Sequence, residues 1–506
     1  MFNIQLRYLK PLLEKEKKKN DGLLMSTSAL SLDKGSSSGK EVTLPFSDRG
    51  RLGYLISIDA MLEHCLMIQY LYSAYSIDTS YIPQSIQGTE KEDDYKKKQA
   101  SWKEVILGVA KEEMGHFISV QNVLRCLGFP LNFGRQDFPW DSSLQPFPFE
   151  LEKFSFQSIA KYIYAESPEG WFTKDDKDID PEDLAARNFI KEMYAQSKDE
   201  IELGDPVGAI FAEILEMLND DEVIKQLTFD QDTYPYQAKF DEWGRGYKDG
   251  QRGRSMLSQI DHDKFDKKTP NVLVEPIATR YEAIAALEKI AEQGEATDED
   301  NQTPSHFERF LQIFKEMMIF SQDSGFSFAK EIVSNPQISE EIVDDPDLGN
   351  NVITNPKTQQ WANLSDLRYH ILLSFLTHSF LLEDGLNDPI KRTARGLIIN
   401  STFGEMYNIR TLSTILTDQP VKNNTDKYKA GAPFQLPFNL DLPIGERNKW
   451  LAHKDLLDGS IQVAEQLITM IDDEGDANAT ANKRYLYGLI EADKKLLESI
   501  QKLTKK

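Results

Sequence analysis

The chain has 506 residues, of which 40% are hydrophobic and 10% aromatic, the composition of an ordinary globular protein. Its formal net charge of −24 at pH 7 argues against nucleic-acid binding, because a phosphate backbone is bound by clustered Lys and Arg. It argues equally against an anionic membrane surface. No apolar run approaches the roughly 18 residues of a membrane span, and the start has no apolar core of a signal peptide. With only two cysteines, a disulfide framework is not expected. We expect a cytoplasmic location instead.

The chain opens with a segment of low complexity and continues into long helices. Residues 1–43 are rich in Ser, Gly and Lys and are expected to form a mobile leader. Apolar residues that recur every three or four positions predict helices over about 51–78 and 101–127, the second ended by Gly128 and Pro130. The charged connection between them, which contains "KEDDYKKK", is expected to be solvated.

The rest of the chain alternates between aromatic, irregular stretches and further helices. Residues 131–180 are expected to form a structured loop over the helices, and 228–272 an ordered lid. Further helices are predicted over about 181–202, 205–219 and 276–294. Another is predicted to begin at the N-cap Thr303, with Pro304 in its first turn. Three or four more helices are predicted between 362 and 503. Strand patterns are scarce, which predicts an all-α protein with a helical bundle over 44–330 and a C-terminal helical domain over 331–506.

Acidic and histidine residues lie on the predicted buried faces of the first two helices. Glu113 and His116 fall on the apolar stripe of the second helix, whereas Glu112 lies about 100° round the helix and is expected to be solvated or flanking. Asp59 and Glu63 fall on the stripe of the first helix. These positions would normally carry apolar side chains.

The helix predicted over 276–294 repeats this feature near its end. Its stripe carries Glu288 and Glu295, with Glu288 or Glu292 as the alternative to Glu295 as a ligand, and His306 follows in the first turn of the next helix. A tight antiparallel connection between the two helices would bring Glu295 and His306 together.

Several buried carboxylates imply a shared cation. A bare buried carboxylate costs several kcal/mol, and Lys and Arg are nearly absent from these stripes. Glu-x-x-His places both side chains on one helix face, the pattern of di-iron carboxylate bundles, and carboxylate with imidazole ligation suits iron or manganese. We therefore predict one or two Fe²⁺ ions per chain, with manganese as the alternative metal. The predicted ligands are Glu63, Glu113, His116, Glu295 and His306.

Each of these side chains also has a structural interpretation. A satisfied core histidine is the alternative for His116, and an exposed helix end is the alternative for His306. Tyr70, two turns beyond Glu63, is predicted as a catalytic neighbour of the metal, redox-active or hydrogen-bonding, or else as a packed core tyrosine. Three other histidines are predicted to be structural: His64, His370 and His378.

At these residues the sequence resembles the ferritin-like domain family of the iminophenylpyruvate dimer synthase type, found in the tryptophan-dimerising enzymes of violacein and rebeccamycin biosynthesis. The matching stretches are "LEHCLMIQYLYSAYSI" (62–77), "VAKEEMGHFISVQNVLRCLGFP" (109–130), "TRYEAI" (279–284), "IAEQGEATDEDNQTPSHFERFLQIF" (290–314) and, more loosely, "AGAPFQLP" (430–437). The resemblance implies a ferritin-like four-helix bundle with long irregular insertions, a non-haem iron site and oxidative chemistry on a small molecule. The residues matching the family's two half-sites are Glu63, Glu113 and His116 for the first, and Glu295 and His306 for the second. Two departures are a second half-site without a clean Glu-x-x-His and "IQY", with Gln69, where relatives have "PPY".

The expected function is therefore that of a non-haem, di-iron oxidase or oxygenase acting on a small amino-acid-derived or aromatic metabolite of secondary metabolism. The aromatic stretches 131–150 and 228–247 are candidates for the walls of its pocket. The alternatives are an imine-dimerising synthase that works with a partner amino-acid oxidase, and a metal-free structural scaffold; iron storage fits poorly with a chain of this length. Expected partners are the substrate, O2 and other enzymes of a biosynthetic pathway, with no nucleic acid and no membrane, and a homo-oligomer is compatible with the C-terminal helices.

Overall fold

The computed structural model describes residues 47–504 with internal gaps. The predicted leader, 1–43, lies outside the described residues, as does most of the stretch expected to be a lid. The gaps are 141–146, 169, 197–206, 244–271, 296–303, 323–324, 339–350, 384–392, 424–427, 437–439, 473–474 and 477.

Within these residues the regular structure is helical, with isolated β-bridges and no strand. The predicted all-α fold is thus confirmed. No helix of the described residues is long and apolar enough to span a membrane.

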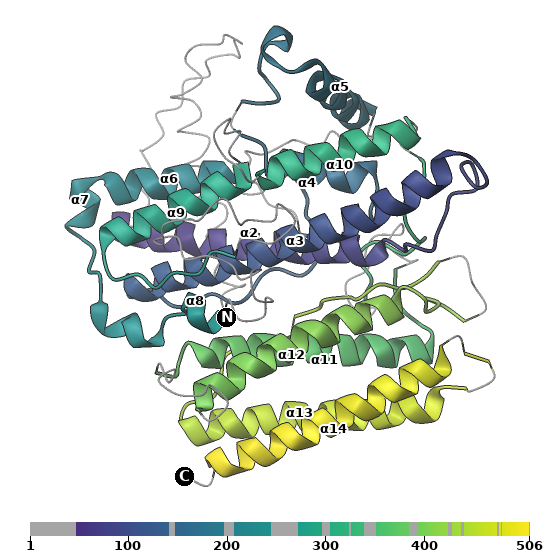
Figure 1. Cartoon of the computed structure of the whole chain (residues 1–506). Helices are drawn as coiled ribbons and strands as arrows, with labels where there is room; N and C mark the ends of the chain where they lie inside the picture. The colour runs from purple at the N-terminus through teal and green to yellow at the C-terminus, as the bar shows by residue number, and fades with distance from the viewer. Residues whose placement is uncertain are drawn as a thin grey trace, which may run out of the picture.

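Six helices form the first bundle (Figure 1). They are α2 (Asp48–Ser76), α3 (Lys91–Cys126), α4 (Phe156–Ala165), α6 (Gly208–Asn219), α9 (Arg280–Glu295) and α10 (His306–Phe320). Helices α2 and α3 are antiparallel: Lys103 Nζ donates to the Ile77 carbonyl, 2.8 Å away, at one end, and Arg49 Nη2 to the Leu127 carbonyl, 3.2 Å away, at the other.

The third and fourth helices of this bundle are each made of two pieces. The Val207 amide donates to the Ala165 carbonyl, 3.2 Å away, so α6 starts where α4 stops. Helices α9 and α10 follow each other along α3, since Gln293 contacts His116 and Arg309 contacts Glu112. The predicted antiparallel connection between α9 and α10 is therefore wrong, because both pieces pack on the same neighbour and run in the same direction.

The excursion between α4 and α6 packs back onto the bundle. It contains α5 (Pro181–Gln196), whose Asp183 accepts from Lys315 of α10 at 2.7 Å. The ring of Trp171 lies 5.0 Å from that of Phe307, edge to face. Short helices at α7 (Asp221–Ile224), η2 (Gln231–Tyr236) and α8 (Phe240–Trp243) complete this part of the chain.

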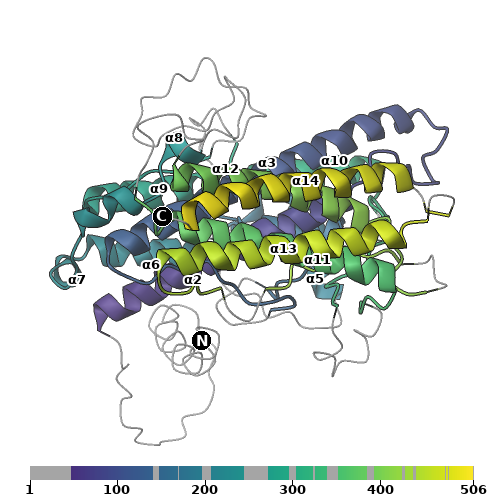
Figure 2. The same ribbon diagram turned by 90° about the horizontal axis from the view of Figure 1, so that it is seen from below.

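Four further helices lie against the first bundle on the side of α2 (Figures 1 and 2). They are α11 (Pro356–Ser379), α12 (Ala394–Leu416), α13 (Glu446–Met470) and α14 (Ala479–Thr504), in agreement with the predicted number. One hydrophobic core runs through both groups of helices, and His64 of α2 bonds to the hydroxyl of Tyr369 on α11. The domain limits predicted from the sequence stay a prediction.

Three element boundaries differ from the sequence expectation. Helix α3 begins at Lys91, not near 101, because the charged run also buries Tyr95 and Gln99 one turn apart. Helix α4 lies within the stretch expected to be a loop, since its ten residues are too short for a clear periodicity. The N-cap of α10 is Ser305, not Thr303, because Ser305 forms a capping box with Glu308.

Candidate metal centre

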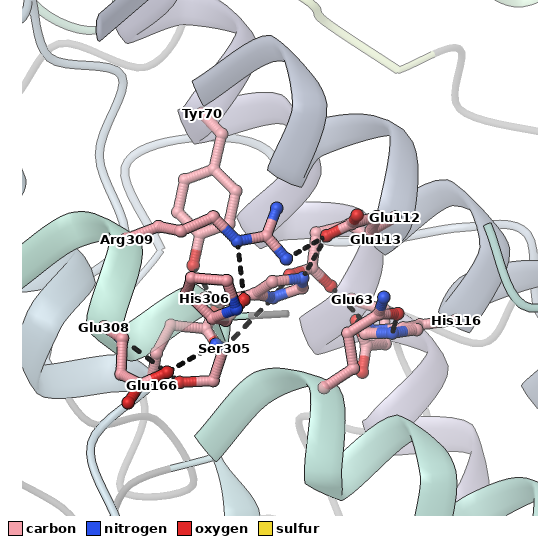
Figure 3. Close-up of polar contacts among 12 residues, drawn as sticks. Glu63, Tyr70, Glu112, Glu113, His116, Glu166, Ser305, His306, Glu308 and Arg309 are labelled. Atoms are coloured by element: carbon pink, nitrogen blue, oxygen red, sulfur yellow. Dashed lines mark hydrogen bonds and ion pairs between the residues drawn. The ribbon is translucent and has the colours of Figure 1, made fainter. Parts of the chain in front are cut away.

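Carboxylates and imidazoles from all four helices of the first bundle meet where the third and fourth helices are interrupted, and Figure 3 shows their side chains turned toward one another. All are buried, with at most 5% of any residue exposed. They are Glu63 of α2, Glu113 and His116 of α3, Glu166 at the C-cap of α4 and His306 at the start of α10.

These residues form two groups that share Glu113. In one group the ligand atoms of Glu63, Glu113 and His116 lie within 4.8 Å of one another; in the other, those of Glu113, Glu166 and His306 do. The Nδ1 of His116 lies 3.1 Å from Glu113 Oε2 and 3.5 Å from Glu63 Oε2. The Nδ1 of His306 lies 2.7 Å from Glu113 Oε1 and 3.7 Å from Glu166 Oε2. Glu113 thus turns one oxygen toward each histidine, the arrangement of a bridging carboxylate.

Several buried atoms at this centre lack a well-directed hydrogen bond. They are Glu63 Oε2, both carboxylate oxygens of the neighbouring Asp59 and, although they lie only 2.7 Å apart, Glu113 Oε1 and His306 Nδ1. Each such buried atom costs about 1–3 kcal/mol. A divalent cation held by the Nδ1 atoms and the carboxylates would supply the missing partner, and this donor set suits iron or manganese. The residues therefore fit a metal centre.

The other ring nitrogen of each histidine is held by an outer residue. Nε2 of His116 lies 2.8 Å from Gln293 Oε1, and Nε2 of His306 lies 2.9 Å from Glu112 Oε2. Glu112 also accepts from Arg309 Nη2 at 2.6 Å. Outer acceptors of this kind put the proton on Nε2 and leave Nδ1 free to bind a metal.

Glu112 corrects a sequence expectation, since it is fully buried rather than solvated. The start of α10 packs beside it and contributes both His306 and Arg309. Burial acts to raise the pKa of Glu112, but Arg309 and His306 lower that pKa to about 2. Glu112 is therefore a charged residue inside the core.

The remaining shifts describe the centre without metal. Burial and repulsion from Glu63 raise the pKa of Glu113 well above its ordinary value. Burial also acts to raise the pKa of Glu63, but a hydrogen bond with Glu113 and attraction to His116 outweigh it and lower that pKa. Burial acts to lower the pKa of His306, but the Glu113 charge and hydrogen bonds to Glu112 raise it to about 10. Without metal, protons bound to Glu113 and His306 therefore provide the positive charge that offsets the buried carboxylates.

Glu166 was missed by the sequence analysis. It follows a short helix inside a stretch without clear periodicity, although Ser155 and Ser158 form a capping box before it. Spacing in steps of three and four from Ile159 through Ile163, both fully buried, to Glu166 was the local signal that pointed to it.

The acids predicted on α9 have different outcomes. The side chain of Glu295 lies outside the described residues. Glu288 is exposed, and Glu292 pairs with Lys289 at the surface, so neither faces the centre. The buried face of α9 is instead formed by Ala283, Ala286, Leu287 and Ile290, a second apolar stripe of this helix.

Tyr70 lies against the centre. Its buried hydroxyl donates to Glu166 Oε1, and its ring contacts those of Tyr162 and Phe310, with centroids 4.6 and 4.9 Å away. It is both a packed core tyrosine and a hydrogen-bonding neighbour of a candidate ligand.

The fold and the site define a helical bundle of the ferritin-like class. The family model described as ferritin-like matches residues 58–315, half of the chain, so the chain belongs to the ferritin-like family. It is similar to dichlorochromopyrrolate synthase from Lentzea aerocolonigenes, 32% identical over 144 residues, and to 2-imino-3-(indol-3-yl)propanoate dimerase from Chromobacterium violaceum, 31% identical over 126 residues. These matches confirm the resemblance found in the sequence.

The aligned segments are short compared with this chain and with the two relatives. They cover 25% and 21% of this chain, and only 14% and 12% of the two relatives. No solved structure gives a significant match.

Proposed function

We propose that this protein is a metal-dependent oxidoreductase of the ferritin-like type that uses a pair of iron ions and O2 to oxidise a small amino-acid-derived or aromatic metabolite. The observation that carries the proposal is Glu113, a buried carboxylate shared by two histidine-carboxylate groups. One ion would be held by Glu63, Glu113 and His116, and the other by Glu113, Glu166 and His306.

Charge balance supports this assignment. Asp59, Glu63, Glu113 and Glu166 are buried with no Lys or Arg of the described residues in an ion pair with any of them. Two divalent cations would balance these four carboxylates. In the second group of helices, α11 to α14, buried acids are balanced by an arginine instead: Glu405 and Asp493 pair with the guanidinium of Arg368.

The protein's own residues would orient the ligands and control protons. Ferrous iron, when bound, supplies the electrons that reduce O2. The Tyr70 hydroxyl holds one oxygen of Glu166 and leaves the other directed at the centre. The protons that His306 and Glu113 carry in the metal-free site must leave when metal binds. Burial of all five ligands keeps water from the reacting atoms.

A groove beside α10 supports an aromatic substrate. It has a volume of about 610 Å³ and is lined in part by Trp102, Trp171, Phe307 and Arg309. The three rings offer apolar contact, and Arg309 links the groove to Glu112 next to the centre. Neither of the aromatic stretches expected as pocket walls lines this groove.

The names of the relatives favour a second candidate, imine dimerisation. One relative is named for the dimerisation of 2-imino-3-(indol-3-yl)propanoate, whose indole ring is of the kind that the aromatic lining of the groove suits. In that case a partner amino-acid oxidase would make the imine, and this chain would couple two copies.

The metal centre is tested by elemental analysis of protein purified without oxygen. We expect about two irons per chain in the wild type, and a loss of both in Glu113→Gln, because the shared ligand serves both ions. The matched control is Glu288→Gln, which changes an exposed glutamate of α9 and should retain the metal. Absence of metal above background in a folded wild type would overturn the proposal and favour a structural scaffold.

The reaction class is tested with the loaded protein, O2 and the imine formed from tryptophan by an added amino-acid oxidase. Uptake of O2 that requires this chain, with an oxidised monomer as product, supports the oxidase. A dimer identified by mass spectrometry supports the synthase instead.

A further inference from the structure

We propose that the two metal positions are unequal, and that the His306 position, formed by Glu113, Glu166 and His306, binds its ion first and more tightly than the His116 position, formed by Glu63, Glu113 and His116. This inference rests on the proposed metal centre. It concerns the residues that surround the ligands, which differ between the two positions.

At the His306 position, the two ligands that are not shared with the other position, Glu166 and His306, are each hydrogen-bonded to a residue that is not a ligand. The imidazole of His306 is bonded through Nε2 to Glu112, and Glu166 accepts from Tyr70. Glu112 is itself fixed by Arg309 at 2.6 Å. The backbone of His306 is set by the Ser305 capping box at the start of α10. Ligands held this way lose little conformational freedom when the ion arrives.

At the His116 position the support is weaker. The outer partner of His116 is the neutral amide of Gln293, half-buried near the end of α9. Within the described residues, the ion-pair and hydrogen-bond partners of Glu63 are His116 and Glu113, which belong to the centre. No hydrogen bond from a described residue outside the centre orients its carboxylate.

The outer charges act in the same direction. A carboxylate that accepts from the far nitrogen of a histidine makes the imidazole a stronger ligand, and such outer contacts contribute about 10- to 100-fold in metal affinity. Glu112 provides this effect for His306, whereas the Gln293 amide provides a smaller one. Asp59 adds negative charge one turn from Glu63, but neither of its oxygens is hydrogen-bonded, so it attracts cations without orienting a ligand.

The test is calorimetric titration of metal-free, full-length protein with Mn²⁺, combined with electron paramagnetic resonance at one equivalent. We expect two binding steps whose dissociation constants differ by at least about 10-fold, and at one equivalent the spectrum of isolated Mn²⁺. Glu63→Ala should retain the tight step, whereas Glu166→Ala should abolish it. These two variants assign the positions without disturbing Glu112.

The outer residues are then compared directly. Glu112→Gln should weaken the tight step by about 10- to 100-fold, whereas Gln293→Ala should leave that step unchanged. The thermal transition of each variant reports whether it is folded.

Two results would overturn the inference while leaving the metal centre in place. One is two equal steps, or coupled pairs of Mn²⁺ together with empty protein at one equivalent. The other is a tight step that is lost in Glu63→Ala and retained in Glu166→Ala. If the wild type binds no Mn²⁺ and no Fe²⁺, the metal centre itself fails.

Discussion

Replacing Arg368 should destabilise the C-terminal helices strongly, because one guanidinium balances two buried acids there. Each of the four helices contributes one residue to this cluster: Arg368 from α11, Glu405 from α12, Ser460 from α13 and Asp493 from α14. Arg368 Nε donates to Glu405 at 2.6 Å, and Nη1 donates to both oxygens of Asp493 at 2.9 and 2.8 Å. No other basic side chain of the described residues pairs with either acid.

The magnitude follows from burial. Glu405 and Asp493 are 3% and 2% exposed, and burial already raises the pKa of both despite the attraction of Arg368. Breaking a buried ion pair by removing one partner costs about 3–5 kcal/mol. Arg368→Met should therefore lower the free energy of unfolding of these helices by about that amount, even though the methionine fills much of the arginine's volume.

Hydrogen exchange measured by mass spectrometry on peptides from α11 to α14 reports this local free energy. A loss of about 3–5 kcal/mol corresponds to exchange faster by roughly two to three and a half orders of magnitude. The triple variant Arg368→Met/Glu405→Met/Asp493→Leu removes all three charges and should recover most of the loss. Exchange in Arg368→Met within a few-fold of the wild type would refute the reasoning, as would a triple variant less stable than the single one.

Two further predictions concern packing and pH outside the candidate centre. His378 and His453 lie 2.8 Å apart through their ring nitrogens, with Glu446 on the solvent side, and burial lowers their pKa values to about 4 and about 3. Because the unfolded chain takes up these protons near pH 6.5 and the folded chain does not, stability should fall by about 1.4 kcal/mol per histidine for each pH unit from 6.5 to about 4. Urea unfolding of His378→Gln/His453→Gln should show a smaller slope, because His64 and His370, whose pKa values burial also lowers, still contribute; a slope equal to that of the wild type would contradict the prediction. Gly53→Ala places a Cβ against the ring of Phe129, closer than normal contact distance, and should cost about 1–3 kcal/mol. Gly404→Ala, with no neighbouring atom within 4 Å of its Cβ, should stabilise its helix by about 0.5–1 kcal/mol. Equal thermal shifts of the two variants would contradict this contrast.

Local periodicity was enough to find α2 and α3 and their polar core residues. A helix repeats every 3.6 residues, so Glu63, Glu113 and His116 were recognisable as core-facing from their own neighbours in the chain. The structure brings these three residues together. Their assignment as metal ligands stays a proposal, which the metal analysis tests.

The same method failed where a helix is short or interrupted. Helix α4 has ten residues and lies among loops, and its short buried stripe, which includes Ile159 and Ile163, was overlooked within the aromatic stretch expected to be a loop. On α9, apolar residues suited two stripes, and packing against α3 and α6 selected the one that leaves Tyr281 75% exposed. The start of α10 was placed two residues early for a different reason: Thr303 before Pro304 was preferred over Ser305, although Ser305 and Glu308 have the spacing of a capping box.

The sequence alone therefore determined that the protein is helical, and that one pair of long helices buries acids and a histidine that an apolar core would not contain. Only the tertiary structure decided that Glu166 meets His306 across 140 residues of chain, and that Glu112 is a charged core residue held by Arg309. The physical reason is that local spacing reports which face of a helix is buried. It carries no information on which distant segment supplies the partner, because that contact is made when the interrupted helices close the bundle.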